Sequence, residues 1–239
     1  MTFNLSMDYI NPALDLNQLT AQFGRDRRLL IRDFFKPDVA DALARAVEAI
    51  DWSLCYRDAE GDRRLTGEQL RGLGENQRNH LSNGIMEVAR RQFQFSFFTE
   101  SLADSLNRGE TGLLARFIRW MADENFLNVM RDITGVREVN RVYAQATMYA
   151  PGSFLLAHDD HVDIEDRRLA YVINLTRQWR PDWGGLLNFS ERDGTVSDSF
   201  FPHFNSLSLF AVPQTHFVSY VPPFAQGQRN AITGWLIAA

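Results

Sequence analysis

The chain has 239 residues, of which 45% are hydrophobic and 23% are charged, as in ordinary folded globular proteins. Its net charge of −5 argues against nucleic acid as a main partner, because binding to phosphates requires a basic surface. Cys55 is the single cysteine, which excludes an internal disulfide framework and a cysteine-based zinc site and indicates a reducing compartment.

Neither a targeting signal nor a membrane span is recognisable in the sequence. Residues 1–30 lack the basic and then apolar layout of a signal peptide. No apolar run approaches the roughly 18–20 residues that cross a bilayer. We therefore expect a cytoplasmic protein without a membrane partner.

Up to about residue 135, apolar residues recur at helical spacing. Pro37 begins an apolar stripe that predicts a helix over 37–50, because proline is tolerated in the first turn. The same spacing predicts helices over 86–106 and 112–133.

Strand and loop signals are interspersed among these helices. Short apolar runs predict strands at 29–34 and 51–55. The polar stretch 61–83 predicts a loop or irregular region. The wider segment 56–85 fits either a lid over a pocket or a surface loop.

After residue 136 the pattern changes to short strands separated by turns with glycine or proline, such as Pro151-Gly152 and Asp193-Gly194. Many short strands of this kind are typical of a double-sheet jelly roll or a barrel. The predicted strands are 141–149, 154–158, 169–176, 185–189, 206–212, 215–221 and 229–238.

These patterns predict one α+β domain over 1–239. Its core is a jelly roll, also called a double-stranded β-helix, over 136–239, and this core carries the functional site. Residues 1–135 are expected to form a mainly helical support region whose helices pack on one sheet.

Strand alternation predicts which side chains face a common cavity, because every second side chain lies on the same face. In 141–149, one face carries Tyr143, Gln145, Thr147 and Tyr149. In the last strand, one face carries Arg229, Ala231, Thr233 and Trp235. His158 and Asp160 share a face if their strand persists to residue 160.

A metal site is indicated by His158, Asp160 and His216. Two imidazoles and one carboxylate hold non-haem Fe(II) on one face and leave the opposite positions open. His161-Val162-Asp163 is a second His-x-Asp pair. We favour the first pair because His158 follows the apolar strand 154–157, whereas His161 begins an acidic, turn-like segment. His80 and His203 lie in polar or irregular surroundings that indicate structural roles.

Arg229 is a candidate anion-binding residue. An arginine near the start of a buried strand needs a partner, and its planar guanidinium can bind a carboxylate with two parallel bonds. Thr233 lies on the same face, and Tyr149 is a further donor. The alternative for Arg229 is a salt bridge with a strand-edge Asp or Glu. For Thr233 and Tyr149 it is core packing.

The C-terminal segments resemble the 2-oxoglutarate- and Fe(II)-dependent oxygenases of the prolyl 4-hydroxylase type, from about Tyr143 to Ile237. The last strand, Arg229-Asn230-Ala231-Ile232-Thr233-Gly234-Trp235, is similar to that of the hypoxia-sensing members. Four segments resemble the ribosomal-protein prolyl hydroxylases of fungi and animals: 155–160, 167–173, 183–187 and 204–210.

This resemblance implies a role for each candidate residue. His158, Asp160 and His216 would be the iron ligands, and Arg229 would bind 2-oxoglutarate with help from Tyr149 and Thr233. Trp235, Asn174, Tyr143 and Gln145 would line the substrate side, with Asn174 where these enzymes often carry a tyrosine. The cofactors implied are Fe(II), 2-oxoglutarate as cosubstrate, O₂ and, optionally, ascorbate.

The function that follows is hydroxylation of an unactivated C–H bond, with a prolyl residue of a protein or peptide as the favoured substrate. A free amino acid or small metabolite is the second choice. A jelly roll that binds a metal or an anion without catalysis, and hydrolysis at zinc held by the same ligands, are the alternatives from other classes.

Overall fold

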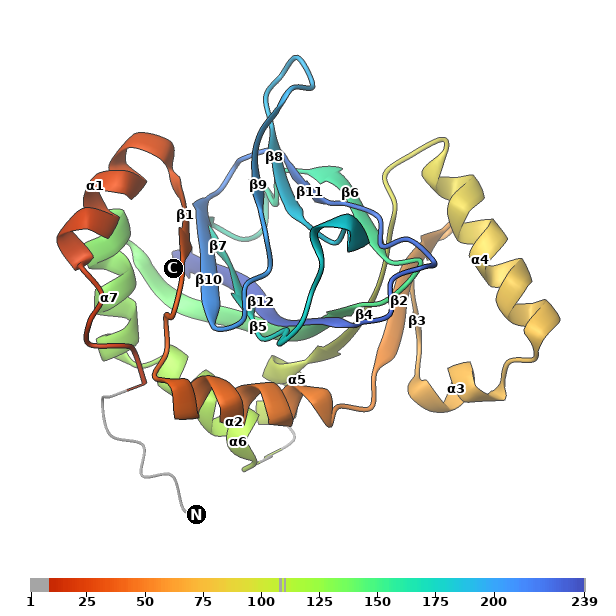
Figure 1. Cartoon of the computed structure of the whole chain (residues 1–239), viewed down its shortest axis with the longest axis horizontal. Coiled ribbons are helices and arrows are strands. Elements are labelled where there is room, and N and C mark those ends of the chain that lie inside the picture. Colours follow the sequence, from red (N-terminus) through yellow and green to blue (C-terminus); the bar gives the residue numbers. More distant parts are fainter. Residues whose placement is uncertain (1–8, 108, 110, 239) are drawn as a thin grey trace.

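An antiparallel sheet that wraps into two facing walls organises the molecule (Figure 1). The computed structural model describes residues 9–107, 109 and 111–238, so the first eight residues of the segment 1–30 lie outside it. Within these ranges the sheet has 12 strands. They are β1 (Arg28–Ile31), β2 (Ser53–Asp58), β3 (Gly61–Leu65), β4 (Phe95–Ser101), β5 (Val139–Tyr149), β6 (Phe154–His158), β7 (Arg167–Asn174), β8 (Leu187–Ser190), β9 (Val196–Phe200), β10 (Ser206–Ala211), β11 (His216–Val218) and β12 (Arg229–Ala238).

The strand order explains how the two walls meet. One wall runs β1-β10-β7-β12-β5-β4, with the β2–β3 hairpin beside β4, and the other runs β6-β11-β8-β9. Strand β4 pairs with β5 through its C-terminal half and with β6 through Phe95 and Ser96. Phe189 of β8 meets Phe210 of β10 edge-on at 5.1 Å, so the walls face each other. The jelly-roll prediction is confirmed.

Helices cover the outer face of the first wall, as predicted (Figure 1). Ile232 and Leu236 of β12 are fully buried there, on the side opposite Arg229, and pack in one core with helix residues such as Leu43 and Phe117. The helices are α1 (Leu16–Asp26), α2 (Pro37–Glu48), α3 (Gly67–Gly72), α4 (Glu75–Ala89), α5 (Leu102–Asn107), α6 (Leu113–Met121) and α7 (Glu124–Thr134), with a short 3₁₀ turn η1 at Pro181–Trp183. Of these, α3 and α4 lie apart from the others, beside β2 and β3.

The sequence patterns are only partly correct in the N-terminal half. The helix over 37–50 and the strands near 29–34 and 51–55 are present as α2, β1 and β2. The helix predicted over 86–106 is wrong, because this range contains the end of α4, all of β4 and most of α5. Phe95 and Phe97 lie on one face of β4, and pairing with both walls overrides the helical spacing.

Two other predictions need correction. The range 112–133 contains two helices, because Asp123 caps α7 by accepting a hydrogen bond from the backbone N–H of Asn125. The stretch 61–83 is not a loop: it contains β3, α3 and most of α4. Thr66 and Gln69 form a reciprocal capping box at the start of α3. Segment 56–85 is thus built of regular elements.

All predicted C-terminal strands are present, with shifted ends, whereas β9 and the helix α1 were missed. Strand β9 was missed because its sequence, Val-Ser-Asp-Ser-Phe, contains no apolar run; three of its five residues are exposed. The β8–β9 hairpin projects from the body (Figure 1). Strands β1 and β4 also show that the sheet draws on residues before 136.

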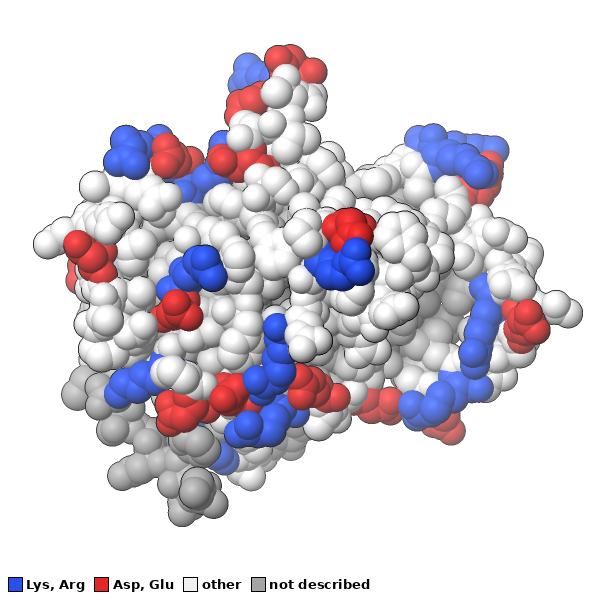
Figure 2. Space-filling model, in the orientation of Figure 1, with Lys and Arg blue, Asp and Glu red and all other residues white. Residues whose placement is uncertain are grey.

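Figure 2 shows basic and acidic side chains interspersed over this face of the molecule. Several form exposed pairs, such as Arg177 with Asp41 and Arg180 with Asp182. Exposed pairs of this kind typically contribute about 0–1 kcal/mol each. The free energy of folding therefore depends mainly on the buried core.

In the described ranges, none of the helices combines the length and the apolar character that a bilayer crossing requires.

Gly234 in β12 lies where the strands of the first wall approach one another closely. A Cβ atom there would lie 1.8 Å from the backbone oxygen of Tyr143 and 2.8 Å from the hydroxyl of Tyr171. We expect Gly234→Ala to lower the free energy of unfolding by about 3 kcal/mol or more, because backbone cannot yield cheaply. Gly24→Ala in α1, where nothing lies within 4 Å, should be neutral or slightly stabilising in the same urea titration. Equal stability of the two variants would contradict this packing.

Candidate metal centre

Pairing between two strands of the second wall places the histidines. His158 is the last residue of β6 and His216 the first of β11, and the two residues are direct partners in the antiparallel register. The strand does not persist to residue 160, so the expected alternation does not place Asp160. Instead, Asp160 has a φ of 63°, a left-handed turn that directs its carboxylate back between the imidazoles.

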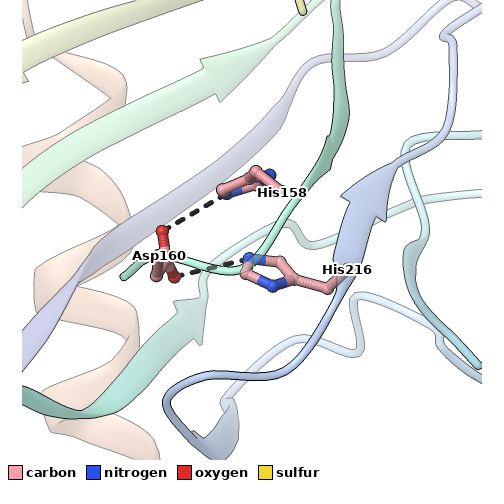
Figure 3. A group of neighbouring side chains, drawn as sticks. All are labelled: His158, Asp160 and His216. Atoms are coloured by element: carbon pink, nitrogen blue, oxygen red, sulfur yellow. Dashed lines mark ion pairs between the residues drawn. The ribbon is translucent and has the colours of Figure 1, made fainter. Parts of the chain in front are cut away.

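The three side chains converge on one point (Figure 3). His158 Nε2 lies 3.3 Å from one oxygen of Asp160, and His216 Nε2 lies 3.4 Å from the other. One ligand atom from each residue falls within 4.8 Å of the other two. Among the described residues this is the only such cluster of potential metal ligands.

Each imidazole is oriented by its second nitrogen. His158 Nδ1 lies 3.0 Å from the carbonyl oxygen of Leu156, and His216 Nδ1 lies 2.8 Å from that of Gln214. A carbonyl only accepts, so both Nδ1 atoms carry the proton and donate. This leaves the Nε2 lone pairs directed at the shared point, the arrangement that metal-binding histidines require.

Burial and local charge set the protonation of the cluster. Burial, assisted by the neighbouring His158, lowers the pKa of His216 to about 4. Burial would raise the pKa of Asp160, but hydrogen bonding to His158 and the charge of His216 outweigh it and hold that pKa below its usual range. For His158, burial opposes protonation, yet the hydrogen bond to Asp160 raises the pKa overall. A metal ion bound here would displace the proton that the His158–Asp160 pair attracts.

Arg229, the first residue of β12, is a buried cation with an incomplete set of partners. Its side chain is 3% exposed, and burial lowers the pKa of the guanidinium to about 10. Nη2 donates to Oδ1 of Asn174 at 3.3 Å, whereas Nε and Nη1 have no hydrogen-bond partner. No described Asp or Glu forms an ion pair with Arg229, which argues against a structural salt bridge. A buried charge of this kind needs an anionic ligand.

The metal ligands and Arg229 line one cavity of about 410 Å³ between the walls. Four other candidates also line it: Tyr149, Thr233, Trp235 and Gln145. The ring of Tyr149 lies under the guanidinium of Arg229, and its centre is 5.3 Å from Arg229 Cζ. The alternation predicted for β5 and β12 is therefore confirmed at these positions.

Tyr143 and Asn174 do not line this cavity, which corrects their expected place on the substrate side. Tyr143 is the register partner of Trp235, and its ring packs beside that of Trp235 with centroids 5.4 Å apart. Asn174 is 1% exposed at the end of β7 and holds Arg229.

Sequence reasoning missed several residues of the lining. The hydroxyl of Thr147 is buried without a partner beside Arg229's strand, and alternation had already placed Thr147 on this face. The phenyl rings of Phe93, Phe95 and Phe97 form a row along the cavity wall, with successive centroids 6.1 and 5.5 Å apart. Their spacing of two was the strand signal that the helix prediction obscured.

The remaining histidines lie elsewhere. His161 and Asp163 are 63% and 98% exposed, outside the cluster. His80 is exposed on α4, and His203 lies in the turn before β10. The first His-x-Asp pair is the one that meets His216.

The residues present fit Fe(II) and a dicarboxylate. The two imidazoles and one carboxylate converge on the shared point, and all three side chains line the cavity. Arg229 provides unbonded donors for a carboxylate in the same cavity.

Removing one ligand should strongly weaken metal binding. We expect His216→Ala and Asp160→Asn each to weaken Mn(II) or Fe(II) binding by more than the roughly 10–100-fold typical of outer-shell changes, because a direct ligand is lost. Anaerobic calorimetric titration measures this. His161→Ala is the matched control and should bind metal as the unmodified protein does. A similar loss in His161→Ala would transfer the site to the second His-x-Asp pair.

Comparisons with known proteins agree with this geometry. Prolyl 3-hydroxylase OGFOD1 of Xenopus laevis is 30% identical over 138 residues, which cover 55% of this chain and 26% of that protein. The mouse protein of the same name is 27% identical over 138 residues. The chain spans about a quarter of the length of these curated relatives.

Solved structures share the fold at low sequence identity. A prolyl-4-hydroxylase of Pseudomonas putida superposes with a TM-score of 0.62 at 18% identity, covering 94% of this chain and 100% of that one. A prolyl hydroxylase of Trichoplax adhaerens, solved with a peptide fragment of hypoxia inducible factor, gives 0.61 at 16% identity, covering 93% and 89%. The family model of the 2OG-Fe(II) oxygenase superfamily matches residues 144–237. The matched residues include His158, Asp160, His216 and Arg229, so the similarity to this superfamily covers the whole candidate site.

Proposed function

We propose that this protein is an Fe(II)- and 2-oxoglutarate-dependent dioxygenase that hydroxylates a prolyl residue of a protein or peptide. The observation that carries the proposal is the placement of the His158–Asp160–His216 cluster and an unpaired, buried Arg229 in one cavity. A merely structural His-Asp-His cluster would not require a guanidinium without an anion nearby.

Different residues of the cavity would bind the iron and the cosubstrate. His158, Asp160 and His216 would hold the iron, and Arg229 would bind the distal carboxylate of 2-oxoglutarate, with Tyr149, Thr147 and Thr233 as neighbouring hydroxyls. Bound iron and 2-oxoglutarate supply the oxidising chemistry with O₂. The aromatic row and the packed walls orient the substrate and exclude water.

The character of the lining supports a prolyl substrate. Phe93, Phe95 and Phe97 present ring faces and edges on the side of His158, with Phe93 5.8 Å from its imidazole. Apart from the three metal ligands and Arg229, the charged groups of the lining already have partners: Asp62 pairs with Arg57 at 2.8 Å, and Arg167 with Glu165 at 2.8 Å. A free amino acid would need charges available for its ammonium and carboxylate groups. An uncharged prolyl ring within a peptide does not.

The relatives support the same substrate class. The curated proteins are named prolyl 3-hydroxylases, and two of the solved structures are prolyl hydroxylases, one of them with a peptide bound. We also propose a cytoplasmic location, for which the single cysteine is the support.

Turnover with defined substrates tests the proposal. With Fe(II), 2-oxoglutarate and O₂, we expect a library of proline-containing peptides to show a one-oxygen mass gain with matching succinate release, and His158→Ala to show neither. Fragmentation and NMR of the product identify the carbon that is oxidised. His161→Ala should retain activity. Oxidation of free proline or another small molecule, with no peptide oxidised, would favour the alternative substrate class. Succinate release without oxidation of any peptide or small molecule would reject the substrate proposal.

Arg229→Lys separates charge from geometry at the cosubstrate site. Lysine retains a cation but lacks the planar fork that binds a carboxylate with two bonds. We expect the KM for 2-oxoglutarate to rise about 10–100-fold, as the loss of a charged hydrogen bond worth roughly 1.5–3 kcal/mol implies. The KM for the peptide should change little. An unchanged KM for 2-oxoglutarate would remove Arg229 from cosubstrate binding.

A further inference from the structure

We propose that Asn174 is a positioning residue that fixes the guanidinium of Arg229 and, because it is a neutral acceptor, keeps that cation available for the carboxylate of the cosubstrate. The inference rests on the proposed function for the identity of the ligand. Its structural part depends only on the contacts between β7, β10 and β12.

Asn174 lies where these three strands meet. It is the last residue of β7 and pairs with Ala231 of β12 and with Ser206 of β10. Its Oδ1 accepts from Arg229 Nη2 at 3.3 Å. Its Nδ2 donates to the hydroxyl oxygen of Ser206 at 3.1 Å and lies 3.4 Å from that of Ser208. One amide therefore connects the arginine to two hydroxyls across the wall.

The chemistry of the partners fixes the orientation of this amide. A guanidinium only donates, so it must face the amide oxygen. The hydroxyl of Ser206 donates to the carbonyl oxygen of His203 at 2.7 Å, which leaves its oxygen to accept from the amide nitrogen. A flipped Asn174 would lose both bonds in a site that is 1% exposed. Asn174 is therefore held rigidly from behind and holds Arg229 in turn.

The neutrality of Asn174 has an electrostatic consequence. Arg229 is 3% exposed, yet Nε and Nη1 remain unbonded and no described carboxylate pairs with it. Removing a charge from water without a counter-ion destabilises the folded protein. An aspartate at position 174 would supply that counter-ion internally, whereas an asparagine leaves the role to a ligand. Ligand binding and charge neutralisation thus become the same event.

Asn174→Asp reverses this arrangement without changing side-chain size. We expect the variant without ligand to melt at a higher temperature than the unmodified protein, since Arg229 gains a counter-ion. With Mn(II) as a redox-inert metal, calorimetry should show 2-oxoglutarate affinity reduced about tenfold or more, and its stabilising effect on melting should shrink accordingly. In turnover, the KM for 2-oxoglutarate should rise while kcat at saturation changes little.

Asn188→Asp is the matched control. Asn188 is also buried, donates to the carbonyl oxygen of Leu186 and does not line the cavity. An aspartate there loses that bond and meets no cation, so melting temperature should fall while 2-oxoglutarate affinity is unchanged. Ser208→Ala is a milder second variant, should Asn174→Asp fail to fold. Ser208→Ala removes one contact of the Asn174 amide, which should lower 2-oxoglutarate affinity a few-fold.

The outcomes separate this inference from the proposed function. If the unmodified protein binds 2-oxoglutarate and both Asn174→Asp and Ser208→Ala bind it equally well, the positioning role is wrong. If Asn174→Asp lowers the melting temperature as Asn188→Asp does, the counter-ion argument is wrong. If the unmodified protein does not bind 2-oxoglutarate, but Asn174→Asp still raises the melting temperature, the contact stands and the proposed function fails.

Discussion

The pairing of β6 with β11 is the constraint on which the metal centre depends. It sets His158 directly opposite His216, and the carbonyls of Leu156 and Gln214 each hold the Nδ1 atom of one ring. Asp160 then needs only a short left-handed turn to reach both Nε2 atoms. A shift of the register by one residue would send the two imidazoles to opposite faces of the wall.

The first wall, which contains β12, buries the cation Arg229 and leaves it able to bind an anion. Helices and the apolar face of β12 exclude water from one side of Arg229, and the cavity lies on the other. The guanidinium is oriented by a neutral amide and underlain by the ring of Tyr149. Orientation is thus achieved without neutralising the charge, so affinity for a carboxylate is preserved.

Sequence patterns predicted the chemistry better than the architecture around it. Strand alternation identified the faces of β5 and β12, since both strands are long and each has one face on the cavity. The same reasoning failed at Asp160, where a backbone turn replaces the strand, and at Asn174, whose buried partners lie on two other strands. Strand β4 was hidden because Phe93, Phe95 and Phe97 adjoin a true helix, and only tertiary pairing decides between the two states.

Strand β4 joins the two walls, because its side opposite β2 pairs with β5 through its C-terminal half and with β6 through Phe95 and Ser96. The segment that matches the superfamily, 144–237, does not contain it. Without the N-terminal half, β10 would lose β1, and β5 and β6 would lose β4, so the segment would carry three newly open strand edges, which are prone to self-association. The N-terminal half, in which few motifs are recognisable, therefore supplies the strands that complete the sheet around the site.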